Sequence, residues 1–305
     1  MAQHEMYFAS EKERKIWKTK FVISRVLLFT FLTLFALFIL LPFWFMIVTS
    51  LKSSDAYQIE QQRKILRLFI PFNEISFLNF SKIFGTKGNF GQYFLNTAIV
   101  AIASTAFTVV TSVLAAFAFA RLEFKGKNLL FTVFLATMMV PGEMMIITNY
   151  QTAISLQWAN TFAALILVHG ISVFYIFYLR QTFQQIPNEL YLASKVDGYG
   201  EFHYLVKVMV PIAMPTIVTI IILNMMGSWN AYIWPNLIAS GTNPITGQDM
   251  KLVSNGLMSL FTSEFKSEDT VKIAGSMVVT APLLLVFIFF RKYIMRGVSR
   301  SGIKG

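Results

Sequence analysis

Long runs of uncharged, mostly apolar residues, separated by short charged segments, make up most of the chain after Arg25. A helix needs about 20 such residues to cross the hydrocarbon core of a bilayer. Four runs are each long enough for one crossing: 26–51, 88–120, 208–248 and 273–290. These runs predict four membrane-spanning helices, of which the last is short.

The run 128–179 is too long for a single span and contains one acidic residue, Glu143. It divides at the polar stretch Thr148–Thr161, so we expect two spans here. The total of six predicts an all-α polytopic transmembrane helical bundle over residues 26–290. Residues 1–25 and 291–305 are then terminal segments on the same side of the membrane.

The composition favours lipid as the solvent of this chain. Hydrophobic residues make up 55% of it and charged residues only 13%, with 31 phenylalanines, whereas a soluble domain carries about 25% charged residues. The net charge of +11 lies in segments that flank the apolar runs, which indicates membrane orientation rather than nucleic-acid binding. The chain has no cysteine, which excludes disulfides and thiolate metal ligands.

Lysine and arginine are unevenly distributed between the two sides that six spans would create. The segments 1–25, 120–128, 180–207 and 291–305 hold 17 of them, and the segments 51–92, 148–161 and 239–272 hold 9. Cytoplasmic loops carry the excess of positive residues. We therefore expect a multi-pass plasma-membrane protein with both termini in the cytoplasm and an uncleaved first span.

The cytoplasmic segment 180–215 has the pattern of two short helices joined by a turn. Glu189 follows Pro187 near the start of the first helix, where an acidic residue complements the positive helix end. Asp197-Gly198 is a turn signal, and a second short helix is expected over Glu201–Met209. A small helix presented to the cytoplasm is suited to docking into a groove of a partner protein.

This segment resembles the coupling loop, or EAA motif, of bacterial ABC importer permeases. Leu192, Ala193 and Ser194 align with the E-A-A triplet, Gly198 with the loop glycine and Pro215 with the final proline. The residues before the triplet match the P-x-E-L of the carbohydrate branch. Leu192 and Ser194 depart from the motif, and Glu189, one turn earlier, is the acidic residue that could replace the motif glutamate.

Other segments extend the resemblance along the chain. They are Ala115–Lys127, Met139–Glu143, Trp229–Pro235 and the tail Gly297–Gly305. Together with the coupling loop they resemble the second, six-span permease subunit of maltose-type importers. The resemblance implies the type I ABC importer permease fold and import of a carbohydrate by alternating access.

The same resemblance implies four kinds of partner: a second homologous permease, an ATP-binding subunit dimer, an extracellular solute-binding protein and membrane lipid. The sequence has no G-x-x-x-x-G-K-[ST] phosphate loop. ATP and Mg²⁺ are therefore expected on the partner ATPase, with no cofactor in this chain. We expect Glu189, Leu192, Ala193, Ser194, Asp197, Gly198 and Pro215 to couple the chain to that ATPase.

Three alternatives remain open at this point. An ion-coupled secondary transporter would show several ionisable residues within its spans, and only Glu143 stands out. A membrane enzyme would need paired carboxylates, a nucleophile triad or a metal cluster, and none occurs at credible spacing. An ABC importer for a non-sugar solute such as glycerol phosphate would share every motif above.

Polar residues within the predicted spans are candidates for the translocation pathway. They are Glu143, Asn224, Ser228, Trp229 and Asn230. Amide and aromatic side chains suit the hydroxyl edges and apolar faces of sugar rings. The same residues also fit simpler roles: a glutamate at the end of a span, polar packing between helices, or an aromatic belt at the interface.

The expected outer loop 239–272 contains a turn-rich segment, Gly241–Asp249. Glycine, proline and asparagine favour a projecting turn over a helix. Asn243, Thr246 and Gln248 offer hydroxyl and amide groups that could compete for sugar hydroxyls. We expect this loop to contact the solute-binding protein, the alternative being a plain connector.

Six spans make a testable prediction about topology. Epitope tags at positions 5, 124 and 303 should be accessible only from the cytoplasm, and tags at 75 and 245 only from outside, because positive residues stay in the cytoplasm. Accessibility in intact and permeabilised cells measures this. An external signal at 303 would mean an odd number of spans.

Overall fold

The computed structural model describes residues 11–65, 67–85, 89–262 and 268–299. Nearly all of the described secondary structure is helical, and one isolated β-bridge joins Thr242 to Asp249. The chain divides into two compact units, 1–79 and 80–305, which are considered separately. The end of the tail motif, from residue 300 onward, lies outside the described residues, as do tag positions 5 and 303.

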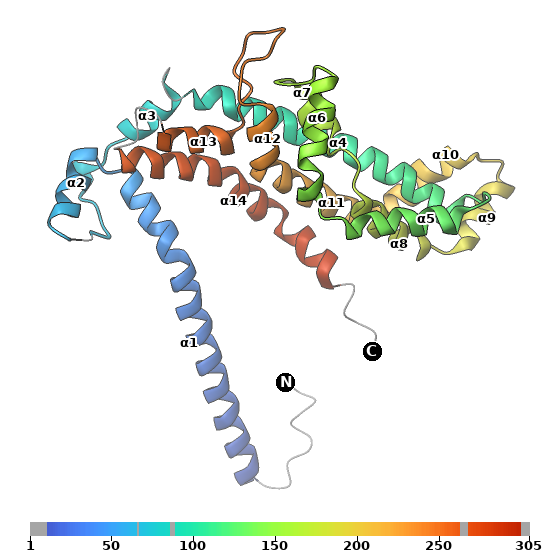
Figure 1. Cartoon of the computed structure of the whole chain (residues 1–305). Helices are drawn as coiled ribbons and strands as arrows, with labels where there is room; N and C mark the ends of the chain where they lie inside the picture. The colour runs from blue at the N-terminus through green and yellow to red at the C-terminus, as the bar shows by residue number, and fades with distance from the viewer. Residues whose placement is uncertain (1–10, 66, 86–88, 263–267, 300–305) are drawn as a thin grey trace. The chain divides into compact units, whose positions relative to one another are not determined.

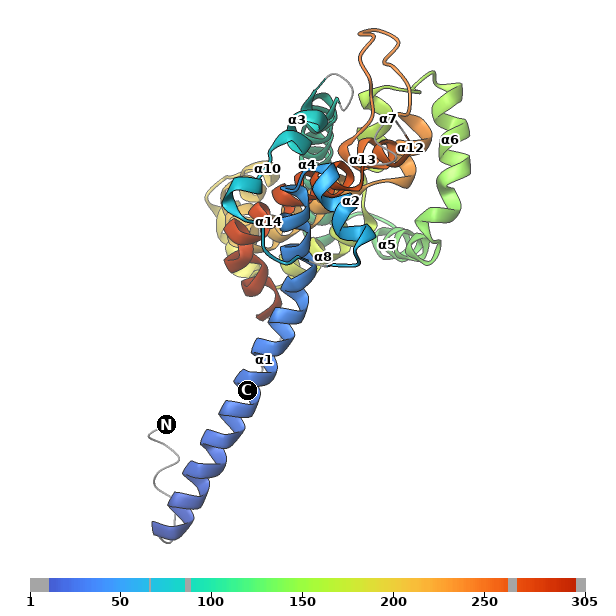
Figure 2. The ribbon, with the colours of Figure 1, turned by 90° about the vertical axis from the view of Figure 1, so that its left-hand side faces the viewer.

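The first unit is dominated by the long helix α1 (Glu11–Ser50), drawn in blue in Figure 2. Its apolar side chains are exposed over most of its length, as expected of a span surrounded by lipid or by another chain. Beyond α1 lie α2 (Ser54–Gln62) and η2 (Phe72–Glu74). A buried ion pair between Lys52 and Glu60, with a 2.6 Å Nζ–Oε2 distance, joins the end of α1 to α2.

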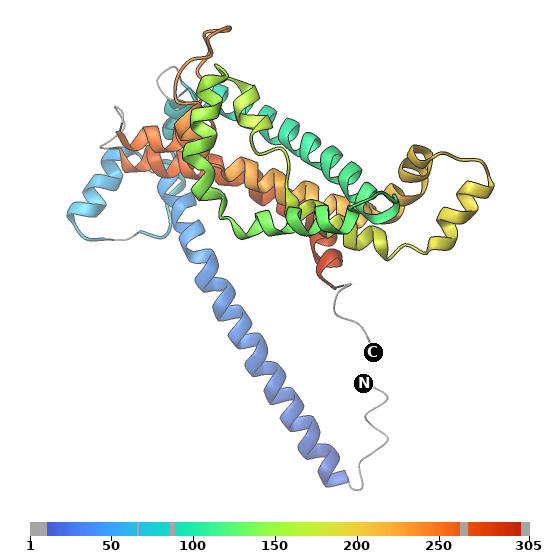
Figure 3. The ribbon, with the colours of Figure 1, turned by 45° about the vertical axis from the view of Figure 1, so that its right-hand side comes forward.

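The second unit contains the remaining helices, beginning with α3 (Leu78–Phe84) at its border (Figure 1). The others are α4 (Phe90–Arg121), α5 (Lys127–Ala136), η3 (Thr137–Met139), η4 (Gly142–Met145), α6 (Ile146–Ser155), α7 (Phe162–Leu167), α8 (Val173–Gln184), α9 (Asn188–Val196), α10 (Glu201–Tyr204), η5 (Leu205–Met209), α11 (Val210–Asn230), α12 (Ile233–Ile238), α13 (Val253–Thr262) and α14 (Asp269–Ser299). Helix α4 packs along α8 and α11, and α14 packs along α11 and α13 (Figure 3).

Four described helices are long and apolar enough to cross a membrane: Trp17–Ser50, Phe90–Arg121, Glu201–Asn230 and Asp269–Arg291. A fifth crossing is available if the pair Lys127–Met139 and Gly142–Ser155, bent by 88°, forms one broken span. The predicted fourth span is divided into the short helices α7 and α8. The helical membrane fold is as predicted, while the count of six stays a prediction.

Two boundaries differ from the sequence prediction. The polar stretch Thr148–Thr161 was expected to connect spans, yet its first half is helical in α6. The second coupling helix, expected over Glu201–Met209, does not end there, because α10, the π-turn η5 and α11 form one helix from 201 to 230. Pro211 lies in the first turn of α11, where a missing N–H costs little.

The main core lies where α4, α8 and the start of the 201–230 helix meet. Its buried members include Phe119, Phe183, Tyr204 and Met209, with many aromatic side chains around them. Burial of each such side chain stabilises the fold by about 1.5–3 kcal/mol in water-exposed parts of the protein. This core holds the end of α4, the end of α8 and the start of the 201–230 helix together, which fixes the base of the predicted coupling loop.

Gly170 marks the break between α7 and α8 and lies directly against α4. A Cβ atom added to Gly170 would be 2.2 Å from Cδ1 of Phe107. Thr111 Oγ1, also on α4, donates a 3.2 Å hydrogen bond to the carbonyl of Gly170. The break therefore needs a residue without a side chain, and α4 satisfies one of the carbonyls that the break leaves unpaired.

Gly170→Ala should destabilise the folded protein by about 1–3 kcal/mol, because the methyl group must displace the Phe107 ring in a packed interior. Gly91→Ala is the matched control, since a Cβ there meets nothing within 4 Å. Thermal unfolding of the detergent-solubilised protein measures the effect. Equal midpoints for the two variants would show that the contact at Gly170 is not restrictive.

Candidate functional site

Helix α9 ends in a turn that requires Gly198. The Tyr199 amide donates to the Ser194 carbonyl at 2.9 Å, and the Gly198 amide donates to the Lys195 carbonyl at 3.1 Å. These two bonds form a Schellman motif, which places Gly198 in the left-handed region at φ +79°. The Asp197-Gly198 turn predicted from the sequence is thus present, with a defined backbone reason for the glycine.

Two arginines hold the base of this loop against the transmembrane helices. Arg121, at the end of α4, donates to the carbonyls of Phe183 and Ile186 at 3.0 and 2.5 Å, where α8 ends. Arg180, on α8, donates to the Phe119 carbonyl of α4 at 3.1 Å. Each helix therefore satisfies carbonyls at the end of the other. The sequence analysis did not identify these residues as functional.

A small polar cluster joins α9 to α10 across the turn. Glu201 Oε1 accepts hydrogen bonds from Tyr191 Oη at 2.7 Å and Lys195 Nζ at 2.5 Å. The hydrogen bond to Glu201 raises the pKa of Lys195 and also that of Tyr191. The cluster gives the loop a fixed shape, so that the segment from α9 to α10 can move as one piece.

The exposed surface of the coupling loop includes several large apolar side chains. Leu192, Val196 and Phe202 are 56%, 88% and 70% exposed. Ala193 and Glu189 are also exposed, whereas Ser194 is buried with its hydroxyl bonded to the Tyr191 carbonyl. Pro215 lies within α11, away from the turn. Figure 3 shows α9 standing apart from α4, α5 and α8, which leaves this surface free.

A cavity of about 440 Å³ lies in the second unit, where three breaks in the helices meet. Gly142 and Glu143 belong to the break between α5 and α6, His169 to that between α7 and α8, and Tyr232 to that between α11 and α12. Non-helical backbone inside a membrane is tolerated where it is buried in protein or lines a water-filled space. The three breaks therefore mark the region suited to a solute.

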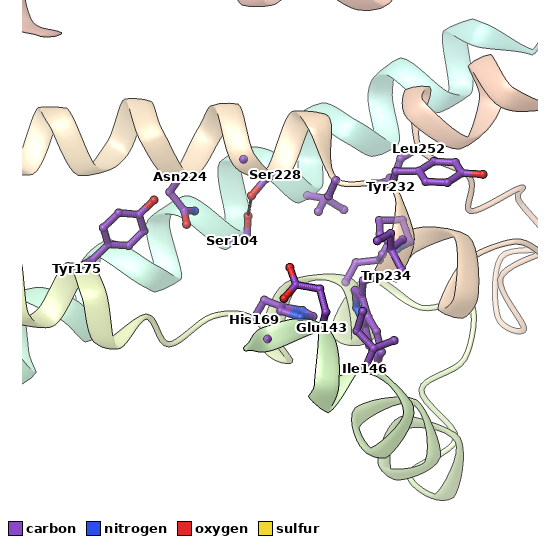
Figure 4. Close-up of a pocket in the computed structure, with 17 residues that line it drawn as sticks. Ser104, Glu143, Ile146, His169, Tyr175, Asn224, Ser228, Tyr232, Trp234 and Leu252 are labelled. Carbon is purple, nitrogen blue, oxygen red and sulfur yellow. Dashed lines mark hydrogen bonds between the residues drawn. The ribbon is translucent and has the colours of Figure 1, made fainter. Parts of the chain in front are cut away.

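Three of the predicted pathway residues line this cavity: Glu143, Asn224 and Ser228 (Figure 4). Asn224 Nδ2 donates to Thr105 Oγ1 at 3.0 Å, and the hydroxyls of Ser228 and Ser104 are 3.0 Å apart. These bonds tie α11 to α4 across the cavity wall.

The other two predicted pathway residues do not line the cavity. Trp229 is buried between α4 and α14, with its ring 5.0 Å from that of Phe94 and its Nε1 bonded to the Val279 carbonyl. Asn230 is exposed and bonds the Met226 carbonyl of its own helix.

The wall also contains residues that the sequence analysis did not propose for the pathway: Ser104, Tyr175, His169, Tyr232 and Trp234. The His169 and Trp234 rings are in edge contact at 5.3 Å, and Trp234 Nε1 bonds the Ala164 carbonyl. The sequence analysis did not predict the non-helical segment 168–172 between α7 and α8, which turns His169 towards the cavity.

The turn-rich segment Gly241–Asp249 projects from the helices between α12 and α13 (Figure 1). Asn243 is buried, and its side-chain oxygen accepts bonds from the amides of Ile245 and Thr246 at 2.9 and 3.0 Å. Asn243 therefore shapes the loop, and its amide does not face a partner. Residues 244–248 are all exposed and form the tip, where Ile245, Thr246 and Gln248 carry the longer flexible side chains.

The loop is anchored at its base. Asn96 Nδ2, on α4, donates to the Asp249 carbonyl at 2.8 Å, and Tyr93 Oη donates to the Asp249 carboxylate at 3.0 Å. Asn160 Oδ1 accepts from the Gly241 amide at 2.8 Å. The tip is thus held by a rigid base. The rest of the expected outer loop includes the helix α13.

Apolar helices, helix breaks grouped around one cavity and a projecting loop that carries a short helix are features of a helical membrane transport protein. The sequence matches the family described as "Binding-protein-dependent transport system inner membrane component" over residues 109–301. This match covers more than half of the chain. The protein therefore belongs to that family of ABC transport permeases and is a multi-pass membrane protein.

Individual relatives match over nearly the whole chain. The arabinooligosaccharides transport system permease protein AraQ of Bacillus subtilis is 28% identical, over 94% of this chain and 98% of its own. The diacetylchitobiose uptake system permease protein NgcG of Streptomyces coelicolor is 28% identical, over 88% and 86%.

Two solved structures share the fold. One is a bacterial ABC transporter involved in import of the acidic polysaccharide alginate, with a TM-score of 0.73 and 20% identity over 94% of this chain and 99% of the matched chain. The other is a bacterial alginate ABC transporter in complex with its pentasaccharide-bound periplasmic protein, with a TM-score of 0.55 and 14% identity over 93% and 97%. The predicted permease fold is confirmed.

Proposed function

We propose that this chain is a permease subunit of an ATP-driven importer for saccharides and that the α9–Gly198 loop transmits the work of a separate ATPase. The observation that carries the proposal is the loop itself: a nine-residue helix with exposed apolar side chains, closed by a glycine that the backbone requires. Such a surface suits insertion into a groove of a partner protein.

The proposed solute class follows from the relatives and from the cavity. AraQ and NgcG are named for arabinooligosaccharides and diacetylchitobiose. The cavity combines aromatic rings with amide and hydroxyl groups, which is a suitable lining for saccharides. An ion-coupled transporter is disfavoured, since among the described residues the cavity wall has one carboxylate, Glu143, and one histidine, His169, and neither lysine nor arginine.

We propose that the working assembly contains a second permease, an ATP-binding subunit dimer and an extracellular binding protein, with both termini of this chain in the cytoplasm. ATP and Mg²⁺ would bind the ATPase, because this sequence has no phosphate-loop motif. Closure of the ATPase dimer would displace the coupling loop, and the bundle would alternate between outward- and inward-facing states.

The geometry provides a route for this displacement. The cluster around Glu201 fixes α9 to the start of the helix that runs from 201 to 230. That same helix carries Asn224 and Ser228 at the cavity. A shift of the loop would therefore be transmitted to the cavity wall along one helix, which contains the π-turn η5 and Pro215.

Gly198→Val should abolish solute-stimulated ATP hydrolysis while the protein still inserts into the membrane. A residue with a side chain costs at least about 1 kcal/mol in the left-handed region, and the β-branched valine costs more. The turn would open and α9 would lose its position. ATP hydrolysis by the reconstituted assembly, with and without loaded binding protein, measures this.

Gly200→Val is the matched control. Gly200 has φ −77° and ψ 166°, which valine adopts readily, and a Cβ there meets nothing within 4 Å. This variant should keep its stimulation, and Gly198→Asn should keep part of it because asparagine tolerates the left-handed region. Normal stimulation in Gly198→Val would refute the proposed role of the turn.

We also propose that the tip of the outer loop contacts the binding protein. Alanine at Ile245, Thr246 and Gln248 together should lower binding-protein-dependent transport roughly tenfold, because exposed side chains at the centre of an interface carry most of its energy. Assembly and basal ATP hydrolysis should be unchanged. Gln151→Ala, an exposed change on α6, is the control. Unaltered transport by the triple variant would make the loop a plain connector.

A further inference from the structure

The cavity where the three helix breaks meet has an acidic side chain without a lysine or arginine to balance it, a feature that the proposed function does not require. We propose that Glu143 makes this cavity a charge-selective solute subsite, which accepts neutral and cationic saccharides and rejects acidic ones. This inference rests on the proposed transport function and adds the chemical class of the solute.

The charge of the cavity comes from one residue. Of the 17 side chains and glycines on its wall, Glu143 is the one acidic group, and the wall includes neither lysine nor arginine. His169 is the other group that can carry charge near neutral pH. With His169 neutral, the cavity has a net charge of about −1 in surroundings where charges are weakly screened.

The carboxylate of Glu143 is available to a ligand. Among the described residues no hydrogen bond or ion pair engages it, and the residue is exposed. Figure 4 shows its oxygens directed into the cavity, towards Ser104 and Ser228. The chain breaks at Pro141–Gly142, where the flanking helices are bent by 88°, and this bend aims Glu143 away from the helix axis.

The remaining wall suits a polyhydroxylated ring. The volume of about 440 Å³ lies within the usual range of ligand pockets, about 300–1,000 Å³. Trp234 and Tyr175 offer aromatic faces or edges, and the hydroxyls of Ser104 and Ser228 offer donors and acceptors. Nε1 of Trp234 is bonded to the Ala164 carbonyl, so its ring is fixed in position.

Electrostatics then separates three solutes of similar shape. A neutral sugar can donate hydroxyl hydrogens to the Glu143 carboxylate, and an amino sugar can pair its ammonium group with it. A uronic acid brings a second carboxylate into a site with no cation to receive it, which is unfavourable in a partly desolvated space. The matched importer of alginate, an acidic polysaccharide, therefore shares the fold but should differ from this protein in the charge of its cavity.

The absence of cysteine from the chain makes the local charge measurable. Gly227 lines the cavity, and a Cβ there meets nothing within 4 Å, so Gly227→Cys introduces one thiol into open space. In the assembled transporter, we compare the rate at which this thiol reacts with a cationic methanethiosulfonate reagent and the rate at which it reacts with an anionic one. Both rates are measured with and without ATP. The cationic reagent should react faster, and adding Glu143→Gln should lower the ratio of the two rates at least about fivefold.

Two controls isolate the effect. Glu123→Gln removes an equal charge at a side chain that is 92% exposed outside the cavity, and it should leave the ratio at Gly227→Cys unchanged. Gly91→Cys places the thiol at an exposed position with free space around it, and its ratio should not respond to Glu143→Gln. A ratio at Gly227→Cys that does not change with Glu143→Gln would overturn the proposal, as would a thiol that neither reagent reaches in either state.

Sugar probes test the solute class at the same thiol. Glucosamine and glucose should slow modification of Gly227→Cys by a neutral maleimide, and glucuronate should not; Glu143→Gln should allow glucuronate to protect. In Gly227→Cys with Glu143 intact, glucuronate that protects as well as glucose would contradict the inference. So would the absence of protection by all three sugars. Stimulation of ATP hydrolysis by the loaded binding protein is measured in parallel. Normal stimulation without charge selectivity would refute the proposed subsite and leave the proposed transport function intact.

Discussion

Every backbone N–H and C=O group within a bilayer must find a partner inside the protein, and this constraint organises the second unit. Continuous helices meet it by themselves, but the chain breaks near Pro141, Gly170 and Tyr232. The breaks are grouped around one cavity and are supported by α4, whose Thr111 bonds the Gly170 carbonyl. A polar site in the membrane is thus obtained by concentrating irregular backbone where protein and water can surround it.

The hydrophobic pattern was sufficient to predict the long helices. The runs around α1, α4, α11 and α14 each form a helix of the expected kind, although α1, α11 and α14 contain the internal prolines Pro42, Pro215 and Pro282. The Asp197-Gly198 turn was equally predictable. Glycine readily adopts the left-handed backbone conformation that the turn requires, and Gly198 is the residue that adopts it.

The remaining features depend on tertiary contacts that a pattern does not record. Residues 168–172 contain Gly170 and Ser172, the N-cap residue of α8, but one glycine and one serine are tolerated within a span, so the break is established only by the close approach of Phe107 to Gly170. Tryptophan is a residue type suited to binding sugars, yet the position of Trp229 on the helix directs its side chain towards α14. Asn243 was predicted to face a partner, but its side chain folds back onto its own turn, as asparagine often does.

The π-turn at Leu205–Met209 has a consequence for sequence change in this family. A π-turn holds one residue more than an α-helical turn, so it behaves as a single-residue insertion within the helix. Each residue of an α-helix advances the side chains by about 100° around the axis. Removal of one residue from the π-turn would leave a regular α-helical turn, with Asn224 and Ser228 still facing Thr105 and Ser104. A deletion in the regular part of the helix would instead rotate both side chains away, so single-residue deletions between the coupling loop and the cavity should be tolerated at the π-turn and selected against elsewhere.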